Sequence, residues 1–425
     1  MTAKLIDDCF VLDKDRLPHD EAVGILKTRV HPVTEMVQVN LADAAGRFLA
    51  EPIIAPRPIP GHDNAAVDGY AFAASDYDVQ EGSTFRIVGA AAAGHPYEGE
   101  PASGDAVRIF TGAVMPAELN TVVMQEDVQI EDRGGEHYVL IPPGLKPGAN
   151  CRLAGEDTKP GETLVAAGAR LRPQDVGSAA AAGLGAIQCR APLKVAVFST
   201  GDEILRPGES FVEGKVYDAN APMLHGLVET IGTEAVDLGV LPDTRSDVID
   251  ALSEASKAFD AIVISGGASQ GQEDHVVASI DALGKRHLWQ IAIKPGRPMS
   301  FGQIGDCVVL GLPGNPVAVF VCFLLYVRPV LTVLAGGSWP EPTRFPVVAN
   351  FTQKKKVGRR EFWRARLMQD NGKLVVTKFA RDGSGLISSL READGLIEVA
   401  EDVAAVVAGE LVDFIPYTEF GIRPS

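Results

Sequence analysis

Cysteine is scarce in this sequence, and no two cysteines are spaced as metal ligands. The chain holds 5 cysteines in 425 residues, with no Cys-x-x-Cys pair: Cys9, Cys151, Cys189, Cys307 and Cys322. An odd number of scattered cysteines is typical of a reducing compartment, whereas secreted disulfide folds carry even, closely spaced sets. We therefore expect a cytoplasmic protein with neither a zinc site nor a disulfide framework.

Basic residues are in the minority. Lys and Arg number 39 against 56 Asp and Glu, which gives a formal net charge of -17 and a pI of about 4.9. Nucleic acid and anionic membrane surfaces repel so acidic a chain, and neither is expected as a partner. An anionic ligand would need a local basic pocket.

The chain also lacks an unbroken apolar run of membrane-spanning length. Its most apolar stretch, 307–327, is interrupted by Pro313-Gly314-Asn315-Pro316 and followed at once by Arg328. A spanning helix needs about 20 apolar residues, so this stretch predicts a buried strand, a turn and a buried helix. The N-terminal stretch MTAKLIDDCFVLDKDRL has no apolar core of signal-peptide length.

Familiar catalytic motifs are missing as well. There is no GxGxxG fingerprint and no GxxxxGK[ST] loop, and none of His62, His225 and His275 has a Ser or Cys nucleophile elbow beside it. Positioning and metal-ion electrostatics fit the residues that are present better than covalent catalysis does.

The length predicts two to four domains. Residues 16–53 and 151–190 have helical spacing, including LADAAGRFLAEPI, and predict a small helical linking domain in which 172–187 packs against the first helices. Residues 54–150 predict an inserted β-rich domain. Alternating strands and helices over 191–337 predict a doubly wound, mostly parallel α/β sheet. Residues 1–15 could belong to the same domain. Residues 338–425 predict a C-terminal β domain.

Polar or glycine-rich turns end four strands of the predicted sheet, at Ser199, Asp243, Ser265 and Pro313. Parallel strands end at one edge, where the backbone N–H groups of glycine turns bind anions. Glu203, Asp243 and Asp274 follow three of these strands, and carboxylates beside a phosphate site make sense if Mg²⁺ bridges them. One such turn alone is more readily a capped loop, but the set favours a functional site.

Other residues are suited to binding an oxyanion. Lys294 and Arg297 flank a Pro-Gly turn, which alone is as readily a solvated turn. Arg364 and Ser384 are a cation and a hydroxyl that could also bind an oxyanion. Taken alone, each is more readily explained as an ordinary surface residue. The dense basic run 354–360, KKKVGRR, is a candidate rim for an anionic ligand.

The remaining polar turns are weaker signals. Asp68 and Thr111 lie in the predicted insert, where such polar residues more often cap turns between strands than take part in a site. Arg152 stands near Glu156 and Asp157, which is ambiguous between an interdomain ion pair and a ligand contact.

Eight motifs occur in an order that resembles a known family. They are DNAAVDGYAF, RIFTGAVMP, AGEDTKPGE, FSTGDEI, YDANAPML, SGGASQGQED, IKPGRPMSFG and LPGNPVAVF. They resemble the MoeA family of molybdopterin molybdenumtransferases, which includes the E domain of gephyrin and that of its plant counterpart, over nearly the whole chain. The resemblance implies a multidomain α/β plus β fold with a MogA/MoaB-like α/β domain, a β-rich insert, a small helical linking domain and a C-terminal β-barrel-like domain.

The resemblance also implies an activity and partners. The chain would insert molybdate into adenylylated molybdopterin with Mg²⁺ and release AMP. It would act as an elongated homodimer whose cleft lies between the α/β domain of one subunit and the insert of the other. A MogA-like adenylyltransferase and molybdoenzyme chaperones are further expected contacts.

The family's functional positions map onto two sets of residues. Those linked to activity are Asp68, Thr111, Asp157, Glu203, Asp243 and Asp274, of which Asp243 and Asp274 would hold Mg²⁺. Those expected to bind substrate are Arg152, Ser265, Gly266, Gly267, Ser269, Gly271, Lys294, Arg297, Pro313, Pro316, Arg364 and Ser384.

Some positions depart from the family pattern, and alternatives stay open. Gln290 stands where many relatives have lysine, Arg297 replaces a lysine, Ala65 and Val67 replace Ser and Met, and Gln270 enters the loop. A non-catalytic molybdopterin-binding scaffold dimer, a tungstate-inserting homologue and a nucleotidyl enzyme that borrows the α/β module are the rival interpretations.

Overall fold

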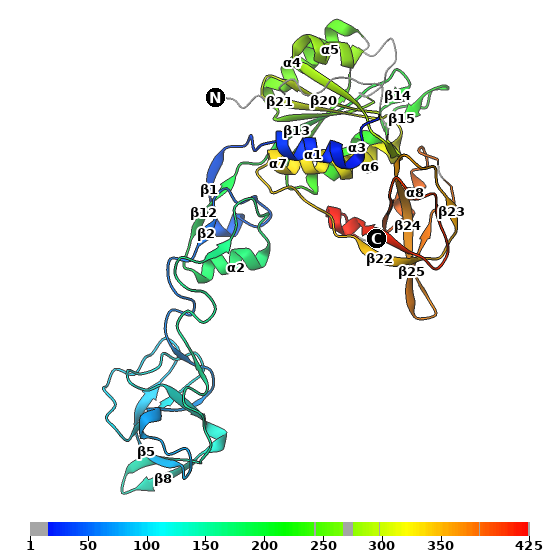
Figure 1. Cartoon of the computed structure of the whole chain (residues 1–425). Coiled ribbons are helices and arrows are strands. Elements are labelled where there is room, and N and C mark those ends of the chain that lie inside the picture. Colours follow the sequence, from blue (N-terminus) through cyan, green and yellow to red (C-terminus); the bar gives the residue numbers. More distant parts are fainter. Residues whose placement is uncertain (1–15, 242–243, 267–274, 297, 382, 424–425) are drawn as a thin grey trace.

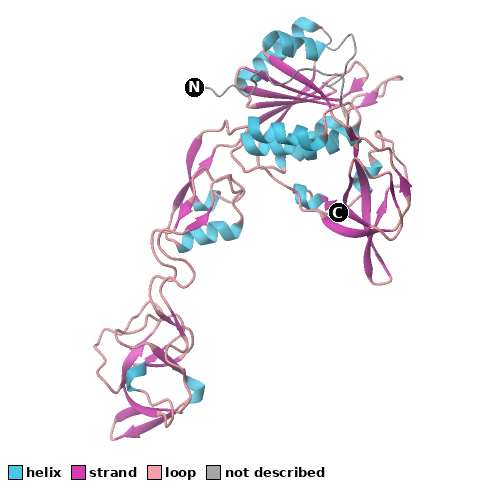
Figure 2. Ribbon diagram, viewed as in Figure 1, coloured by secondary structure: helices cyan, strands magenta, loops and turns pink. Residues whose placement is uncertain are grey.

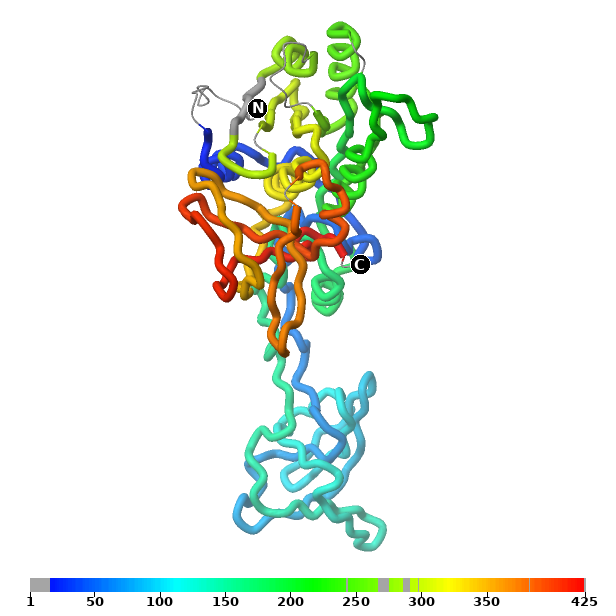
Figure 3. The backbone as a smooth tube through the Cα atoms, turned by 90° about the vertical axis from the view of Figure 1, so that its right-hand side faces the viewer, coloured from blue at the N-terminus to red at the C-terminus, as the bar shows by residue number. Residues whose placement is uncertain are grey.

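The computed structural model describes residues 16–423, except 242–243, 267–274, 297 and 382. The molecule is elongated: the α/β sheet and a barrel form a large unit at one end, and a small β-unit stands at the far end of two extended legs (Figures 1 and 3). The larger helices gather in the large unit, and strands occur in every unit (Figure 2).

The far unit is the predicted β-rich insert. Its sheet has the order β7-β4-β6-β5-β9-β8. The strands are β4 (Gly69–Phe72), β5 (Ser83–Ala91), β6 (Asp105–Ile109), β7 (Thr121–Met124), β8 (Gln129–Arg133) and β9 (Glu136–Ile141), with turns η2 (Ala74–Asp76) and η3 (Gln125–Asp127). The two faces of the sheet pack separate apolar clusters, one around Val107 and one around Phe72. The insert therefore has its own core.

The legs are narrow. The two legs, residues 53–65 and 151–165, pair as strands at β3 (Asn64–Ala65) with β10 (Cys151–Arg152) and at β2 (Ile53–Ile54) with β11 (Thr163–Val165). Between these pairs they are joined by a bridge of Ile59 with Thr158 and by single backbone hydrogen bonds. No leg residue belongs to the clusters around Val107 and Phe72 except Ala65 and, at its margin, Cys151. The legs connect the insert without adding a core of their own.

The linking unit holds less helix than the sequence predicts. β1 (Met36–Asn40) pairs antiparallel with β12 (Ala186–Arg190), and α2 (Pro173–Ala181) packs beside them. The prediction that LADAAGRFLAEPI is helical is wrong, because it forms one 3-10 turn, η1 (Leu41–Asp43), and then irregular backbone. Its Leu49 and Ile53 are buried with Leu171 and Ile187. Irregular backbone can bury residues at this spacing as a helix can.

The first helix, α1 (His19–Arg29), belongs to the core of the α/β unit. Ala22 and Leu26 lie one turn apart and are buried in the cluster that holds Tyr326 and Leu331, whereas α2 buries Ala179 in the linking core. The expected packing of 172–187 against the first predicted helices is therefore wrong for α1, but 172–187 does share a core with the segment 41–53. Burial of apolar area in this large cluster favours the position of α1 there.

The α/β sheet has the order β16-β13-β17-β21-β20-β18. Its parallel strands are β13 (Lys194–Ser199), β16 (Glu234–Val240), β17 (Ala261–Ser265) and β21 (Cys307–Leu312), and the antiparallel ones are β18 (Lys285–Gln290) and β20 (Pro298–Ile304). Helix α3 (Asn220–Glu229) covers one face, and α4 (Arg245–Ala258) and α5 (His275–Leu283) cover the other. The doubly wound prediction is confirmed.

The register of the parallel strands sets the position of their ends. Ser199 pairs with Ser265, and Ser265 pairs with Leu312, while Val240 also lies opposite Ser199. The four strands thus end at one edge, as the sequence predicts. A short arm made of β14 (Ile204–Leu205) and β15 (Val216–Tyr217) projects beside this edge (Figure 1).

The apolar stretch forms the predicted strand, turn and buried helix. Strand β21 leads through 313–315 into α6 (Pro316–Cys322), a π-helical turn η4 (Phe323–Val327) and α7 (Arg328–Leu334). Within the described residues, this helix alone is long and apolar enough to cross a membrane, but 89% of its apolar window is buried inside the protein. Burial on this scale identifies it as the central core helix.

The C-terminal unit is a closed barrel, which confirms the predicted β-barrel-like domain. Its strands are β22 (Phe345–Ala349), β24 (Arg360–Asp370), β25 (Lys373–Lys378), β26 (Gly395–Val399) and β28 (Leu411–Pro416), closed by pairing of β24 with β26. Shorter elements are β23 (Gln353–Lys354), β27 (Ala405–Val406), α8 (Ser388–Glu392) and η5 (Tyr417–Phe420). Strand β19 (Ile293–Lys294) of the preceding unit pairs in parallel with β24, so the two units share a backbone seam.

An arginine ties the barrel to α1 beside this seam. The Arg360 guanidinium contacts Asp20 at 2.7 Å, Glu398 at 3.0 Å and Glu401 at 3.0 Å. Lys355 is buried and donates to the carbonyls of Glu401 and Val403. For these two members of the basic run 354–360 the predicted role as a ligand rim is wrong, since both cations serve the packing of the barrel.

His19 is buried at the same junction. Its Nδ1 lies 2.7 Å from the Tyr326 hydroxyl, and its ring packs edge-on against Tyr326 and Phe362. Burial, and then the neighbouring Arg360 charge, lower the pKa of His19 from 6.5 to about 4. The folded protein therefore holds a neutral imidazole over most of the acidic range.

This pKa predicts an acid-dependent loss of stability. Neutral His19 makes its full contribution to the free energy of unfolding above pH 6.5. Between pH 6.5 and 4 this contribution falls, because the unfolded chain binds the proton and the folded protein does not. Below pH 4 both states are protonated, and the contribution changes no further. The loss at pH 4 should reach about 3 kcal/mol. In urea unfolding at pH 7.0 and pH 4.5, His19→Gln should lose less stability than the unmutated protein, whereas the exposed control His31→Gln should match it. Equal losses in all three proteins would contradict the prediction.

Candidate functional site

A basic cavity lies where the strand ends of the α/β unit meet the barrel. Its volume is about 410 Å³. It is lined by Gly266, Lys294, Pro295, Gly296, Pro298, Pro313, Gly314, Asn315, Ala318, Phe362, Trp363, Arg364 and Ser384. Five of the residues predicted to bind substrate therefore line this cavity, and they come from both units: Gly266, Lys294, Pro313, Arg364 and Ser384. Two more, Ser265 and Pro316, line an adjoining cavity.

Backbone pairing and close packing position Lys294. Lys294 lies opposite Glu361 in the β19–β24 seam. The next turn rests on α6, where Gly296 has φ +96° and an added Cβ would collide with the Cys322 Sγ. The buried Cys322 thiol in turn donates to the Gly296 carbonyl at 3.4 Å. Any residue other than glycine would push the turn, and Lys294 with it, away from the helix.

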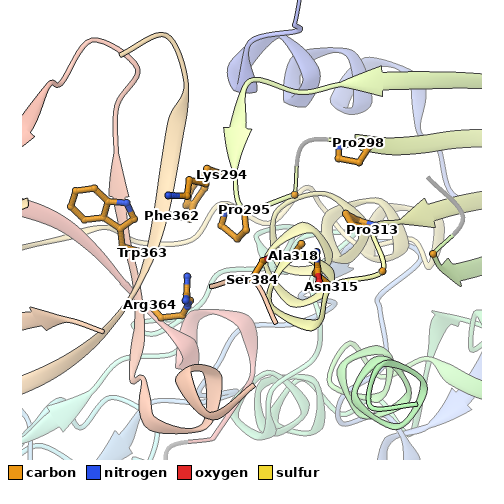
Figure 4. Close-up of a pocket in the computed structure, with 13 residues that line it drawn as sticks. Lys294, Pro295, Pro298, Pro313, Asn315, Ala318, Phe362, Trp363, Arg364 and Ser384 are labelled. Carbon is orange, nitrogen blue, oxygen red and sulfur yellow. The ribbon is translucent and has the colours of Figure 1, made fainter. Parts of the chain in front are cut away.

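Arg364 reaches the cavity from the barrel strand β24. Its side chain is 6% exposed, and its Nε donates to the Ser389 hydroxyl at 3.0 Å. Its Nη2 lies 3.3 Å from the carbonyls of Arg381 and Gly383. Lys294 and Arg364 lie on the barrel side of the cavity, with Pro313 and Asn315 on the opposite side (Figure 4). Two cations at one wall favour an oxyanion as the occupant.

A second cavity, here called the strand-end cavity, adjoins the first. Its volume is about 480 Å³, and it shares Gly314 and Asn315 with the basic cavity. Its other lining residues are Ser199, Thr200, Glu203, Ile204, Val216, Tyr217, Asp218, Ala219, Asn220, Ser265, Pro316 and Gly385. It contains no Lys or Arg among these residues, and its acids and hydroxyls suit a ligand with N–H groups.

Asn220 in the strand-end cavity was missed by the sequence reasoning. Its Nδ2 donates to the Ser265 hydroxyl at 2.8 Å and to the Gly314 carbonyl at 2.7 Å, so it joins the ends of two strands. Its Oδ1 and the Ser199 hydroxyl are buried without a partner among the described residues. The motif YDANAPML had drawn attention to this segment, but nothing in the sequence singled out its asparagine.

Asp68 and Thr111 form a pair on the insert. Asp68 Oδ1 accepts from the Thr111 hydroxyl at 2.6 Å and from its backbone N–H at 2.7 Å. These bonds, the hydroxyl first, hold the pKa of Asp68 below its usual value. Within this chain the insert stands far from both cavities (Figure 1). The pair therefore does not join the other predicted residues in one subunit.

Arg152 and Asp157 lie on the returning leg, and both are exposed. Arg152 pairs with Asn64 in the backbone, and the Asp157 N–H donates to the Ile59 carbonyl. Among the described residues no ion pair joins Arg152 to Glu156 or Asp157 within 4.0 Å, and Glu156 instead accepts from the Leu153 N–H. The ligand role of Arg152 and Asp157 stays a prediction.

Several predicted residues lie outside the part of the chain that the structure describes. They are Asp243, Gly267, Ser269, Gly271, Asp274 and Arg297. Both expected Mg²⁺ ligands are in this set, and within the described residues no three His, Cys, Asp or Glu side chains gather as a metal site. Glu203 is exposed at the strand-end cavity, where its carboxylate lies over Gly201.

Three family models match the chain in order. Residues 17–183 match the MoeA N-terminal region (domain I and II), residues 196–333 a probable molybdopterin binding domain, and residues 346–417 the MoeA C-terminal region (domain IV). Together they span the linking unit with its insert, the α/β unit and the barrel.

Relatives match over nearly the full length. The molybdopterin molybdenumtransferase of Haemophilus influenzae is 36% identical over 386 residues, which cover 90% of this chain and 94% of that protein. That of Bacillus subtilis is 29% identical and covers 94% of each. A crystal structure of the molybdopterin biosynthesis MoeA protein from Pyrococcus horikoshii superposes with a TM-score of 0.79 at 31% identity, over 95% of this chain and 100% of that one. By sequence, domain order and fold, this chain belongs to the MoeA family.

Proposed function

We propose that this chain is a molybdopterin molybdenumtransferase of molybdenum cofactor biosynthesis. It inserts molybdate into adenylylated molybdopterin, cleaves the phosphoanhydride and releases AMP. The observation that carries the proposal is the basic cavity, where Lys294 and Arg364 come together from two units. Beside it lies the strand-end cavity, whose described lining residues include no Lys or Arg. The names and domain order of the relatives support the same conclusion.

Each of the two cavities is assigned one of the two substrates. Lys294 and Arg364 attract molybdate and hold it against the wall of the basic cavity, since charge-assisted hydrogen bonds to oxyanions are strong. The strand-end cavity receives the pterin nucleotide, which is held by the turns after Ser199 and Ser265. Gly314 and Asn315 border both cavities, so the two substrates meet there. Catalysis then comes from proximity and fixed charge.

Mg²⁺ is part of the proposal through two acidic residues that follow parallel strands in the sequence. Asp243 follows β16, whose Val240 pairs with Ser199, and Asp274 follows β17, which ends at Ser265. Carboxylates and phosphate oxygens are the donors that Mg²⁺ prefers. The ion would neutralise charge on the phosphoanhydride. Glu203 is a further carboxylate and borders the strand-end cavity.

The catalytic unit is proposed to be a homodimer in the cytoplasm. The legs hold Asp68 and Thr111 away from the cavities of their own chain, so these residues need a second subunit to take part. Phe110 and Met124 flank the pair on the insert and are partly exposed, which gives a partner an apolar surface. A MogA-like adenylyltransferase would supply the substrate. A purely scaffolding role leaves the two paired cavities without an explanation.

Lys294→Gln tests the molybdate site. Loss of one charge-assisted hydrogen bond costs about 1.5–3 kcal/mol, so the KM for molybdate should rise about 10- to 100-fold. AMP released from adenylylated molybdopterin is measured against molybdate concentration, with Lys257→Gln, an exposed position on α4, as the matched control. An unchanged KM in Lys294→Gln would refute the assignment of the basic cavity. Absence of AMP release by the unmutated protein would refute the proposed function.

Asp274→Asn tests the metal role. The variant should fold normally and lose Mg²⁺-dependent AMP release, because a neutral amide is a poor Mg²⁺ ligand. Activity is titrated with MgCl₂, and Asp281→Asn on α5 serves as the control. A variant with the Mg²⁺ dependence of the unmutated protein would show that Asp274 is not a ligand.

Mixing two inactive variants tests the composite site. Asp68→Asn and Glu203→Gln are each expected to be inactive, and subunit exchange gives heterodimers with one intact cleft made of unmutated residues from both chains. Since half of the dimers carry one such cleft, about a quarter of the activity should return. If both residues acted within one subunit, no activity would return after exchange. Native mass spectrometry confirms that the heterodimer has formed.

A further inference from the structure

Ser389 is fully buried and lies next to the cationic wall of the basic cavity. It belongs to α8 and has an exposed fraction of 0%. Its hydroxyl lies 2.6 Å from the Leu386 carbonyl and 3.0 Å from the Nε of Arg364. It does not line the cavity itself.

The direction of both hydrogen bonds follows from chemistry. A carbonyl oxygen can only accept, so the single hydroxyl proton of Ser389 must point to Leu386. The oxygen lone pairs therefore face Arg364, whose Nε–H can only donate. Because the Leu386 carbonyl fixes the hydroxyl rotor, the acceptor is already oriented before any ligand enters the cavity.

These bonds restrict the guanidinium from one side. Nε is held by Ser389 and Nη2 by the Arg381 and Gly383 carbonyls, so rotation about the last side-chain bonds is opposed at two points. A planar guanidinium fixed in this way presents its donors to an oxyanion in one orientation. These three acceptors are neutral hydroxyl and carbonyl oxygens.

The same loop continues to the opposite wall. The Ser384 carbonyl accepts from the Val317 N–H at 3.0 Å, at the start of α6. Arg364, the loop 381–387 and the first turn of α6 are thus joined by hydrogen bonds around the cavity. Displacement of Arg364 would move Ser384, which lines the cavity, as well.

We propose that Ser389 is a positioning residue that orients the Arg364 guanidinium for molybdate. This inference rests on the proposed function, because molybdate is the oxyanion that function places in the basic cavity. Ser389 acts only through Arg364 and has no contact with substrate.

The test compares Ser389→Ala and Ser389→Cys with Ser388→Ala, a neighbour on the same helix. The cysteine variant keeps the volume but is a weak acceptor, so it guards against a folding defect in the alanine variant. Both Ser389 variants should raise the KM for molybdate about 10-fold with little change in kcat, and Ser388→Ala should not. An unchanged KM in both Ser389 variants would overturn the inference.

A double-mutant cycle separates positioning from general structure. In the background of Arg364→Lys, which keeps a cation but lacks the Nε–H, Ser389→Ala should change the KM by less than about 2-fold. If the change were again 10-fold, Ser389 would act through the fold rather than through Arg364, and the inference would fail.

A measurement without substrate keeps this inference distinct from the proposed function. The Nε–H resonance of Arg364, identified by its loss in Arg364→Lys, should exchange with solvent at least about 10-fold faster in Ser389→Ala. Equal exchange rates would refute the contact even if the enzyme releases AMP. A protein that releases no AMP, yet shows this faster exchange, would refute the proposed function while the contact stands.

Discussion

The pairing of β19 with β24 is the contact on which the arrangement of the site depends. Two residues of the α/β unit, Ile293 and Lys294, extend the barrel sheet by pairing with Arg360 and Glu361. Because backbone hydrogen bonds fix both spacing and direction, this short seam sets where Lys294 lies relative to Arg364 on the same barrel strand. Arg360 strengthens the seam by bridging to α1. Without the seam, Lys294 and Arg364 would lie on two units that no shared sheet connects.

The second requirement is the common edge of the parallel strands. Hydrogen-bond register brings Ser199, Ser265 and Leu312 level, and Asn220 then joins the end of β17 to the turn after β21. The buried helix that begins at Pro316 fills the space beneath and presents its first turn to both cavities. The functional side chains thus depend on main-chain geometry, while the apolar core beneath them keeps that geometry rigid.

Much of this arrangement can be predicted from the sequence, but for unequal reasons. Periodicity identified the doubly wound sheet, and residue chemistry with family motifs identified Lys294 and Arg364, since strand ends and cations carry local signals. The irregular segment after Leu41 was misread because apolar spacing alone does not distinguish a helix from a loop over a small core. Ser389 and Asn220 were missed because their roles arise from contacts between distant segments. Asp243 and Asp274 stay predictions outside the described residues.

The narrow legs have a consequence for the history of the chain. Ala65 pairs with Cys151, so the insert's entry and exit points are neighbours, and its two clusters share almost nothing with the rest of the molecule. A segment whose ends already meet can be inserted into a loop, or removed from it, at a small cost in loop-closure entropy. The insert is in this sense a self-contained domain that can be gained or lost as a unit. Its surface can change by recombination or drift without disturbing the sheet edge that carries the cavities.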